Sequence, residues 1–406
     1  MGGTPETSSS QPVIYLDHAA TTPVRPEVRE AMSAPLDWAF GNPSSVHSAG
    51  RAARALVDEA RDRLAAVLGC GAREVVFTGG GSEADNLALR GVAAAHQGPG
   101  HLIVSAVEHE AVLETTRALQ AQGFQVTELG VDAQGLVDPD ALQAALREET
   151  FLVSVMLANN EVGTVQPIRE LVERVRSNSR ALFHTDATQA LGRLSVSVDE
   201  LGVDLLTVSA HKAYGPKGVG ALYVRQGTQL VPQVAGGGQE RTRRSGTENV
   251  PGIVGMGVAA GLAEEERAAE SARLAGLSLR LQEAIQAAVP DSRPTGAPPP
   301  RRLPNFCTMT FPHVEGELLL LRLDRAGLCA SAGSACASGS LAPSHVLLAM
   351  GMDPELSMGH LRMTLGRGTT AAEVERAAEI VAREVAALRE SATAVSAIPQ
   401  TSTNAP

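Results

Sequence analysis

Short apolar runs alternate with amphipathic stretches along most of the chain. The apolar runs have the length of buried strands and lie at Val75–Phe77, Leu102–Val104, Gln125–Leu129, Phe151–Leu157, Leu182–His184 and Leu205–Val208. Helical patterns, such as the one from Glu83 to Ala95, separate most of them. The alternation predicts an α/β fold in which helices cover both faces of a mainly parallel sheet. In such folds the ligand site lies at the carboxyl ends of the strands.

Further helices are predicted on both sides of this region. Apolar residues recur every four positions between Ser48, which can cap a helix, and Gly69, which would end it. In the second half, the pattern predicts a long helix at Ala259–Ala288 and a proline-rich break at Pro294–Pro304. The segment Phe306–Phe311 follows, and then two more helices are predicted at Glu315–Ala326 and Ala371–Leu388. Residues 1–12 and 391–406 are polar, and we expect both tails to be disordered.

Composition narrows the function classes. The chain has 406 residues, which is enough for two domains, and its net charge of −11 argues against a nucleic-acid-binding surface. Its four cysteines have no C-x-x-C or zinc-type spacing, so neither a disulfide framework nor a structural metal is predicted. No apolar run is long enough to span a membrane, and the first residues lack the features of a signal peptide. We therefore expect a cytoplasmic protein.

Lys212 is the first candidate for chemistry. It follows the apolar stretch Asp204–Val208 and stands within Ser-Ala-His-Lys-Ala-Tyr-Gly-Pro-Lys-Gly, residues 209–218. A lysine at the end of a buried strand can be desolvated, which lowers its pKa and makes it a Schiff-base nucleophile. The motif alone leaves open an ordinary surface loop.

Two more motifs would complete a site for pyridoxal 5'-phosphate (PLP). A short apolar run ends on Asp186, whose carboxylate could keep the pyridine nitrogen protonated, although it could also only cap a helix near Thr188. The strand at Val75–Phe77 runs into Gly79-Gly-Gly-Ser82 and a helix, where backbone N–H groups could bind a phosphate. A strand–helix turn that binds no ligand is the alternative for this motif.

The chain resembles the cysteine desulfurases of the class V aminotransferase family, from about Tyr15 to about Thr370. The matching strings include Tyr-Leu-Asp-His-Ala-Ala-Thr-Thr-Pro at 15–23, Asn-Asn-Glu-Val-Gly at 159–163, His-Thr-Asp-Ala-Thr-Gln at 184–189, Ser-Ala-His-Lys at 209–212, Arg-Ser-Gly-Thr at 244–247 and Ser-Ala-Gly-Ser-Ala-Cys at 331–336. The resemblance implies a fold type I, aspartate-aminotransferase-like PLP-dependent transferase. It also implies a large domain over 23–265 and a smaller α+β C-terminal domain over 266–390, against which residues 13–22 pack.

The resemblance also assigns roles to individual residues. It implies that PLP is bound by Gly81, Ser82, His109, Asp186, Gln189, Ser209, His211, Lys212 and, from the neighbouring subunit of a homodimer, Thr247. Asn160 and Arg362 match ligands of the substrate carboxylate. His109 matches a catalytic residue that stacks on the PLP ring and relays protons, with a capping or surface histidine as its alternative.

Cys336 is the expected nucleophile. It lies among small residues at about 330–343, which suggests a mobile loop that can present a thiolate. A buried structural cysteine is the alternative, and the family motif favours the nucleophile of the long-loop subgroup. The implied reaction converts L-cysteine into alanine and a Cys336 persulfide, with Lys212 moving the Cα proton. We interpret Cys70, Cys307 and Cys329 as structural.

The resemblance leaves the biological partner open. An iron–sulfur scaffold, a tRNA-thiolation enzyme or a DNA-phosphorothioation system could accept the sulfur. The loop has Ala332 and Ala337 where relatives often carry Ser and Thr, which puts the acceptor preference in doubt. A selenocysteine lyase or a true aminotransferase would share the PLP residues, but an aminotransferase has no need of the thiol.

Overall fold

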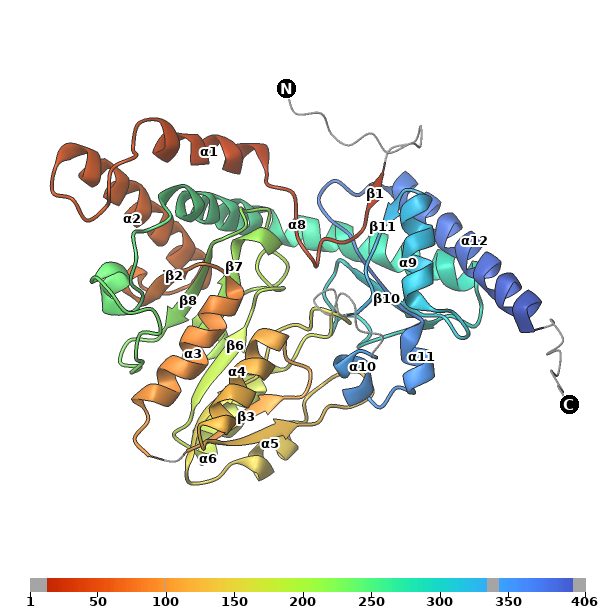
Figure 1. Cartoon of the computed structure of the whole chain (residues 1–406), viewed down its shortest axis with the longest axis horizontal. Helices are drawn as coiled ribbons and strands as arrows, with labels where there is room; N and C mark the ends of the chain where they lie inside the picture. The colour runs from red at the N-terminus through yellow and green to blue at the C-terminus, as the bar shows by residue number, and fades with distance from the viewer. Residues whose placement is uncertain (1–12, 99, 334–342, 397–406) are drawn as a thin grey trace, which may run out of the picture.

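The computed structural model describes residues 13–98, 100–333 and 343–396 (Figure 1). A seven-stranded sheet contains, in spatial order, β2 (Val75–Thr78), β8 (Gly220–Val224), β7 (Leu205–Ser209), β6 (Leu182–Asp186), β5 (Thr150–Ser154), β3 (His101–Ser105) and β4 (Gln125–Leu129). Only β8 runs antiparallel to its neighbours in this sheet. The prediction of a mainly parallel sheet is therefore confirmed.

Helices cover both faces of this sheet (Figure 1). They are α2 (Ser48–Leu68), α3 (Gly81–Ala95), α4 (Glu110–Ala121), α5 (Pro139–Ala145), α6 (Ile168–Asn178) and α7 (Val198–Leu201). The first helix, α1 (Pro26–Asp37), packs instead against the long helix α8 (Val250–Ala288). Neighbouring residues of a strand belong to different cores, because successive side chains point to opposite faces. On β2, for example, Phe77 packs in the core shared with α2 and α6, whereas Val76 packs in the core shared with α3 and α4.

The long helix α8 (Val250–Ala288) begins nine residues before the predicted start. Gly252, Gly255 and Gly257 obscured this first part, because glycine is a poor helix former. In the structure they allow close packing: a Cβ on Gly257 would lie 2.7 Å from Cα of Ala60. The α8 backbone can therefore approach α2 only if this position has no side chain.

The predicted cap of α2 is wrong. His47, not Ser48, is the N-cap residue, and its Nδ1 accepts a hydrogen bond from the Gly50 N–H over 3.2 Å. Ser48 is the first residue of the helix itself. Gly69 ends the helix as predicted, in the left-handed conformation with φ of +68°.

The C-terminal part forms a second core around the far half of α8 (Figure 1). Its elements are β9 (Arg293–Pro294), β10 (Phe306–Thr310), α9 (Gly316–Arg325), β11 (Leu328–Cys329), α10 (His345–Ala349), α11 (Pro354–Met358), β12 (His360–Thr364) and α12 (Ala371–Ser396). The N-terminal strand β1 (Ile14–Tyr15) pairs in parallel with β11. The domain boundaries at 23, 265 and 390 stay predictions.

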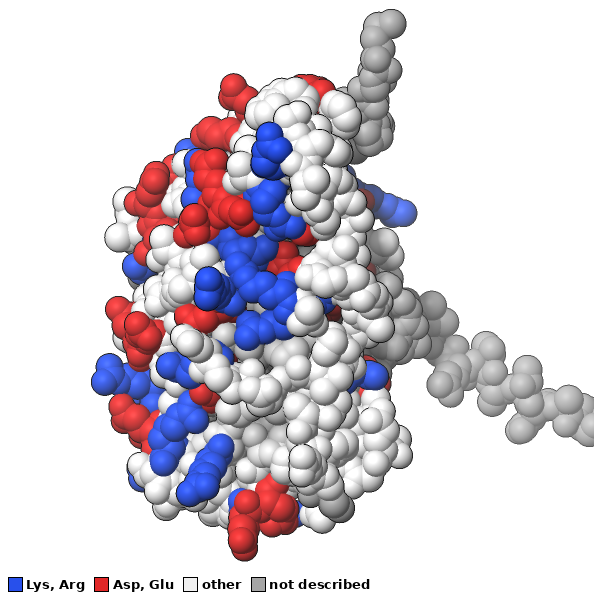
Figure 2. Space-filling view, turned by 90° about the vertical axis from the view of Figure 1, so that its left-hand side faces the viewer, with Lys and Arg blue, Asp and Glu red and all other residues white. Residues whose placement is uncertain are grey.

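One face exposes large apolar side chains. The segment between α1 and α2 leaves Phe40 75% and Val46 87% exposed, and Leu36 and Trp38 are also exposed. Figure 2 views this end of the molecule, where Lys and Arg side chains gather beside a wide area without charged side chains. Large exposed apolar patches mark interaction surfaces.

Three short 3₁₀ turns complete the described elements: η1 (Ala72–Glu74), η2 (Ala210–Lys212) and η3 (Gln239–Thr242). None of the helices within the described ranges is long and apolar enough to cross a membrane.

The contact between α8 and α2 gives a testable prediction. Gly257→Ala should lower the stability by about 1–3 kcal/mol, because the added methyl group overlaps the Ala60 backbone. Gly276→Ala on the same helix is the matched control: no atom lies within 4 Å of the position that its methyl group would take, so it should be neutral or stabilise by up to ~1 kcal/mol. Urea unfolding of both variants measures this. Equal effects would contradict the close packing.

Candidate active site

Motifs from distant parts of the sequence meet at the carboxyl ends of β2, β6 and β7. They surround a cavity of about 680 Å³. The lining includes every predicted site residue except Thr247 and Cys336: Gly81, Ser82, His109, Asn160, Asp186, Gln189, Ser209, His211, Lys212 and Arg362. The structure therefore brings the three cofactor motifs together, as expected for strand ends along one edge of a sheet.

Lys212 stands on η2, directly after β7. Its Nζ donates hydrogen bonds to the carbonyl oxygens of Ala19 over 2.5 Å and Ala20 over 2.8 Å. Gln189 Nε2 donates to the same Ala19 oxygen over 3.0 Å. The N-terminal segment that crosses the cavity thus fixes where the amine of Lys212 and the amide of Gln189 lie.

Asp186 ends β6 and is buried. Its Oδ1 accepts a hydrogen bond from the Thr188 N–H over 2.8 Å. Residues 188–193 form turns and not a helix, so the helix-capping role considered as the alternative is wrong. Asp186 also lines the cavity. The contact with Thr188 leaves Asp186 able to bind a further group, because a carboxylate has several lone pairs and this contact occupies one of them.

A buried polar layer lies behind Asp186. His184, on the same strand, contacts Ser154 Oγ through Nδ1 over 2.8 Å and Thr207 Oγ1 through Nε2 over 3.1 Å. Burial lowers the pKa of His184 to about 3, so the imidazole is neutral. The pKa of Asp85, whose Oδ1 is 3.6 Å from His184 Nε2, is raised by burial and by the nearby Asp186 charge.

The Gly-rich turn opens α3 at the cavity wall. Ser209 Oγ and Thr188 Oγ1 are buried and have no hydrogen-bond partner among the described atoms. A Cβ on Gly81 would lie 3.2 Å from Thr188 Oγ1, so a larger residue would narrow this corner. Unpaired hydroxyls beside a helix N-terminus are suited to phosphate oxygens. Sequence reasoning did not single out Thr188, although it lies within the matched string 184–189.

Two histidines at the cavity have defined hydrogen bonds. His109 caps α4, since its Nδ1 accepts from the Ala111 N–H over 3.0 Å, and this contact places any proton of the neutral ring on Nε2. His211 Nδ1 contacts Thr21 Oγ1 over 3.2 Å. Burial and then the neighbouring Lys212 charge lower the pKa of His211 to about 4, so this ring is a neutral hydrogen-bonding group.

Arg362 is buried in the opposite wall, on β12. It donates to the Asn160 carbonyl oxygen over 2.8 Å and to Asp17 Oδ1 over 3.0 Å. Arg362 Nε and Asn160 Oδ1 are buried, and neither has a hydrogen-bond partner among the described atoms. The structure thus brings the two predicted carboxylate ligands together, and the backbone of one orients the side chain of the other.

Other groups that sequence reasoning missed also line the cavity. Glu161 accepts a hydrogen bond from the Ser344 hydroxyl, and His345 Nε2 contacts the Glu108 carbonyl oxygen over 3.0 Å. Glu161 lies within the matched string 159–163, which was a signal for it. Ser344 and His345 lie far along the sequence, and no local pattern indicated their approach.

Two predicted residues are not placed in the cavity. Thr247 is exposed and does not line it, so a role for Thr247 requires another subunit. Cys336 lies outside the described residues. Cys329 ends β11 and is half-buried, and Cys307 is fully buried in β10.

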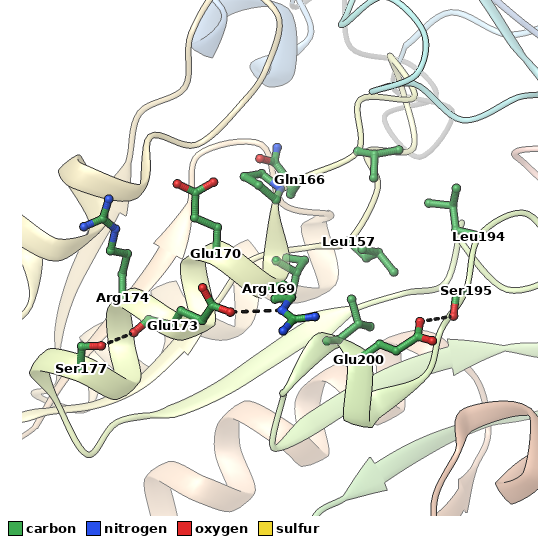
Figure 3. Close-up of a pocket in the computed structure, with 14 residues that line it drawn as sticks. Leu157, Gln166, Arg169, Glu170, Glu173, Arg174, Ser177, Leu194, Ser195 and Glu200 are labelled. Carbon is green, nitrogen blue, oxygen red and sulfur yellow. Dashed lines mark hydrogen bonds and ion pairs between the residues drawn. The ribbon is translucent and has the colours of Figure 1, made fainter.

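A larger groove of about 930 Å³ lies elsewhere, along α6 (Figure 3). Several of its charged groups are already engaged: Arg169 donates to Glu173 over 3.1 Å, and Ser195 donates to Glu200 over 2.8 Å. None of the predicted site residues lines it. The volume of a cavity therefore does not identify the active site in this protein. The polar side chains that converge on the smaller cavity identify it, at the carboxyl ends of the strands.

Comparisons with known proteins identify the family of this chain. The family model for class V aminotransferases matches residues 14–377. "Cysteine desulfurase IscS" from Dictyoglomus turgidum is 49% identical, over 93% of this chain and 95% of that protein. This chain belongs to the class V aminotransferase family, within its cysteine desulfurase group.

Solved structures give the same result. A "NifS-like protein" matches with a TM-score of 0.87 and 36% identity, over 92% of this chain and 99% of that one. The structure described as "SspA in complex with cysteine" matches with a TM-score of 0.75 and 36% identity, over 87% and 98% of the two chains. The fold type I prediction is confirmed.

PLP is the cofactor of this family, and the cavity fits it. The unpaired hydroxyls of Ser209 and Thr188 suit its phosphate, Asp186 suits its ring nitrogen, and Lys212 supplies the amine.

Glu108 gives a testable pH dependence. It is fully buried; its Oε1 accepts from Ser105 and the Met156 N–H, and burial raises its pKa to about 8. The unfolded chain ionises this group at a lower pH than the folded protein does. Its contribution to stability is therefore full in acid and is lost as the pH rises towards the folded-state pKa.

We expect Glu108→Gln to keep the Oε1 contacts and to remove this loss. The variant should gain on the order of a few kcal/mol relative to wild type between about pH 5 and pH 8. Urea unfolding across that range measures the difference. Parallel stability curves for the two proteins would contradict a raised pKa of Glu108.

Proposed function

We propose that this protein is a PLP-dependent cysteine desulfurase, which converts L-cysteine into L-alanine and transfers the sulfur to Cys336 as a persulfide. The observation that carries the proposal is one cavity that joins Lys212, Asp186 and a phosphate-type corner to the buried Arg362. A relative described in complex with cysteine has the same fold.

Each side of the cavity would hold one part of PLP. Ser82, Ser209 and Thr188 would bind the phosphate, Asp186 would keep the pyridine nitrogen protonated, and Gln189 would donate to the ring oxygen. The bound ring supplies an electron sink for the substrate's Cα. His109 lines the cavity and would stack on the ring, and its capping contact with the Ala111 N–H fixes its orientation.

Arg362 would bind the carboxylate of L-cysteine. Its planar guanidinium presents donors in a fixed fork, and Asp17 and the Asn160 carbonyl hold that fork in place. Asn160 Oδ1 belongs to an amide whose N–H₂ group can donate to the same carboxylate. Lys212, once released from its carbonyl contacts, moves the proton from Cα.

Cys336 would complete the reaction as a thiolate. The bond between Cβ and Sγ of the substrate breaks, and a bond forms between that sulfur and the Cys336 sulfur. The substrate's carbon is reduced to a methyl group while the two sulfurs are oxidised to a persulfide, so no external oxidant or reductant is needed. We propose that an acceptor protein, such as an iron–sulfur scaffold or a thiolation enzyme, then removes the sulfur.

We also propose a homodimer in which Thr247 reaches the PLP phosphate of the neighbouring subunit. The exposed apolar side chains of Trp38, Phe40 and Val46 support such an interface. Nearby, η3 is held in strained geometry, with φ of +45° at Glu240, by the buried ion pair between Glu240 and Arg61. Because η3 is held in place, the nearby Thr247 could contact a partner subunit without a change in the backbone of η3.

The nucleophile is tested by Cys336→Ser. The variant should keep the visible absorbance of bound PLP but lose both alanine and sulfide production, because the substrate sulfur has no acceptor. Cys329→Ser, a matched control in β11, should stay active. An aminotransferase would instead retain turnover in Cys336→Ser and release a keto acid, an outcome that would refute the proposal.

The interface is tested by Phe40→Asp. A buried aspartate without a partner is unfavourable in an apolar contact, so the variant should sediment as a monomer and retain less PLP than wild type. Leu321→Asp on α9 makes the same change at an exposed leucine and should remain dimeric. Analytical ultracentrifugation distinguishes the two, and a dimeric Phe40→Asp variant would exclude this surface.

A further inference from the structure

Tyr214 lies two residues after Lys212 in an unusual backbone conformation. Its φ is +63°, a region that bulky residues rarely adopt, and its side chain is buried. Residues keep such strained conformations only where the surroundings hold them, and these sites often have a function. Tyr214 does not line the cavity, so any function must act through its neighbours.

The backbone of Tyr214 is tied to the segment that holds Lys212. Its N–H donates to Thr22 Oγ1 over 2.7 Å, and the same hydroxyl donates to the His211 carbonyl oxygen over 2.8 Å. The Arg25 N–H donates to the Tyr214 carbonyl oxygen over 3.2 Å. The turn after Lys212 therefore cannot shift without breaking these contacts.

The side chain of Tyr214 reaches the C-terminal part of the chain. Its hydroxyl accepts from the Arg367 N–H over 2.7 Å and from Arg193 Nη2 over 3.3 Å. The Arg193 guanidinium also lies over the ring, 5.4 Å from its centroid. Burial of this hydroxyl makes its hydrogen bonds matter more, since water cannot replace them easily.

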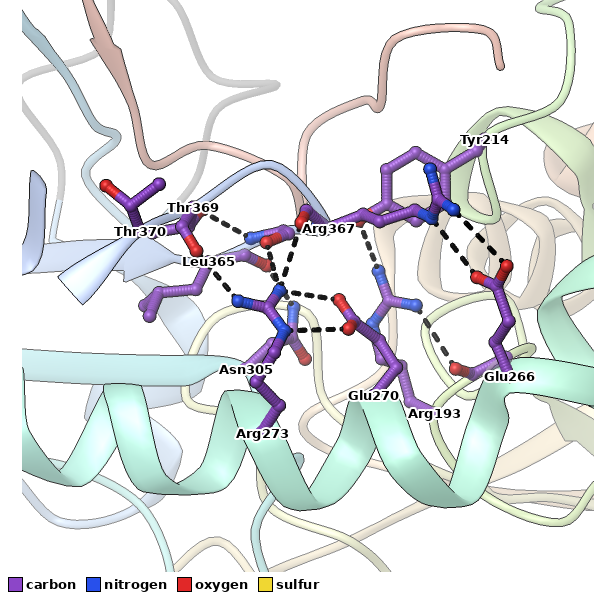
Figure 4. Close-up of polar contacts among 12 residues, drawn as sticks. Arg193, Tyr214, Glu266, Glu270, Arg273, Asn305, Leu365, Arg367, Thr369 and Thr370 are labelled. Atoms are coloured by element: carbon purple, nitrogen blue, oxygen red, sulfur yellow. Dashed lines mark hydrogen bonds and ion pairs between the residues drawn. The ribbon is translucent and has the colours of Figure 1, made fainter. Parts of the chain in front are cut away.

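The turn that Tyr214 contacts follows directly after β12, the strand of Arg362. Arg273 on α8 donates to the carbonyl oxygens of Gly366, Arg367 and Thr369. Figure 4 shows Tyr214 and Arg273 on either side of this turn, with Glu266 bound to Arg367. The turn after β12 is thus held by Arg273 on one side and by Tyr214 on the other. The Tyr214 hydroxyl connects it to the turn that follows Lys212.

We propose that Tyr214 is a positioning residue, which sets the place of Arg362 relative to Lys212 through its hydroxyl. The amine and the guanidinium must engage the same small substrate at Cα and at its carboxylate, so a shift of one against the other weakens productive binding. The inference rests on the proposed function, in particular on Arg362 as the carboxylate ligand.

Tyr214→Phe in the full-length holoenzyme tests the inference. It keeps the ring over Arg193 but removes the acceptor of the Arg367 N–H. We expect the KM for L-cysteine to rise roughly five- to tenfold, kcat to change less than about twofold, and the PLP absorbance to stay. Tyr223→Phe, the same change at a buried tyrosine of β8 outside the cavity, should leave KM unchanged.

A double-mutant cycle with Arg362→Gln separates positioning from general stability. If Tyr214 acts through Arg362, Tyr214→Phe should add little to the KM of Arg362→Gln. Additive increases in KM, or a normal KM in Tyr214→Phe, would overturn the positioning role. A normal KM in Arg362→Gln would instead overturn the proposed carboxylate ligand, so the two failures are distinguishable.

Discussion

The segment from Asp17 to Arg25 holds the site together, because it crosses the carboxyl edge of the sheet and bonds to both parts of the molecule. Ala19 and Ala20 accept hydrogen bonds from Lys212, and Asp17 accepts one from Arg362. The lysine belongs to the sheet of the first core, and the arginine belongs to a strand of the second core. Both are therefore oriented by a chain segment that lies far from either in the sequence.

Burial determines the charge state of the groups around this segment. Carboxyl groups are disfavoured as anions inside the protein, which raises the pKa of Glu108 and Asp85, while imidazoles are disfavoured as cations, which lowers the pKa of His184 and His211. The layer behind Asp186 therefore consists mainly of neutral groups. Because these neighbouring groups are neutral, the Asp186 carboxylate is the group suited to pair with the protonated pyridine nitrogen of PLP.

The sequence predicted those parts of the fold and site that local patterns encode. The positions of Gly79–Ser82, Asp186 and Lys212 could be predicted because each lies at the end of an apolar strand. Parallel strands place their carboxyl ends on one edge of the sheet, so these residues were expected to lie together. The start of α8 was missed because its glycines weaken the helix signal, and one of them, Gly257, allows a close contact with α2 that no local pattern records.

Contacts between segments that are distant in the sequence could not be predicted from local sequence patterns either. Tyr214 lies in a motif that was noticed for its lysine, yet its hydrogen bond to the Arg367 N–H depends on how the C-terminal part packs. The same holds for Thr188, whose unpaired hydroxyl becomes meaningful only beside Gly81 and Ser209. Motifs identified the chemistry, and tertiary packing decided which neighbours support it.

The central claim is that sulfur passes from L-cysteine to one particular thiol. Mass spectrometry of the protein after a single turnover with sulfur-labelled L-cysteine tests it most directly. The account predicts one labelled sulfur on the peptide that contains Cys336, one alanine formed for each label, and loss of the label on treatment with a thiol. Alanine formation with no label on Cys336, or with the label on Cys70, Cys307 or Cys329, would contradict it.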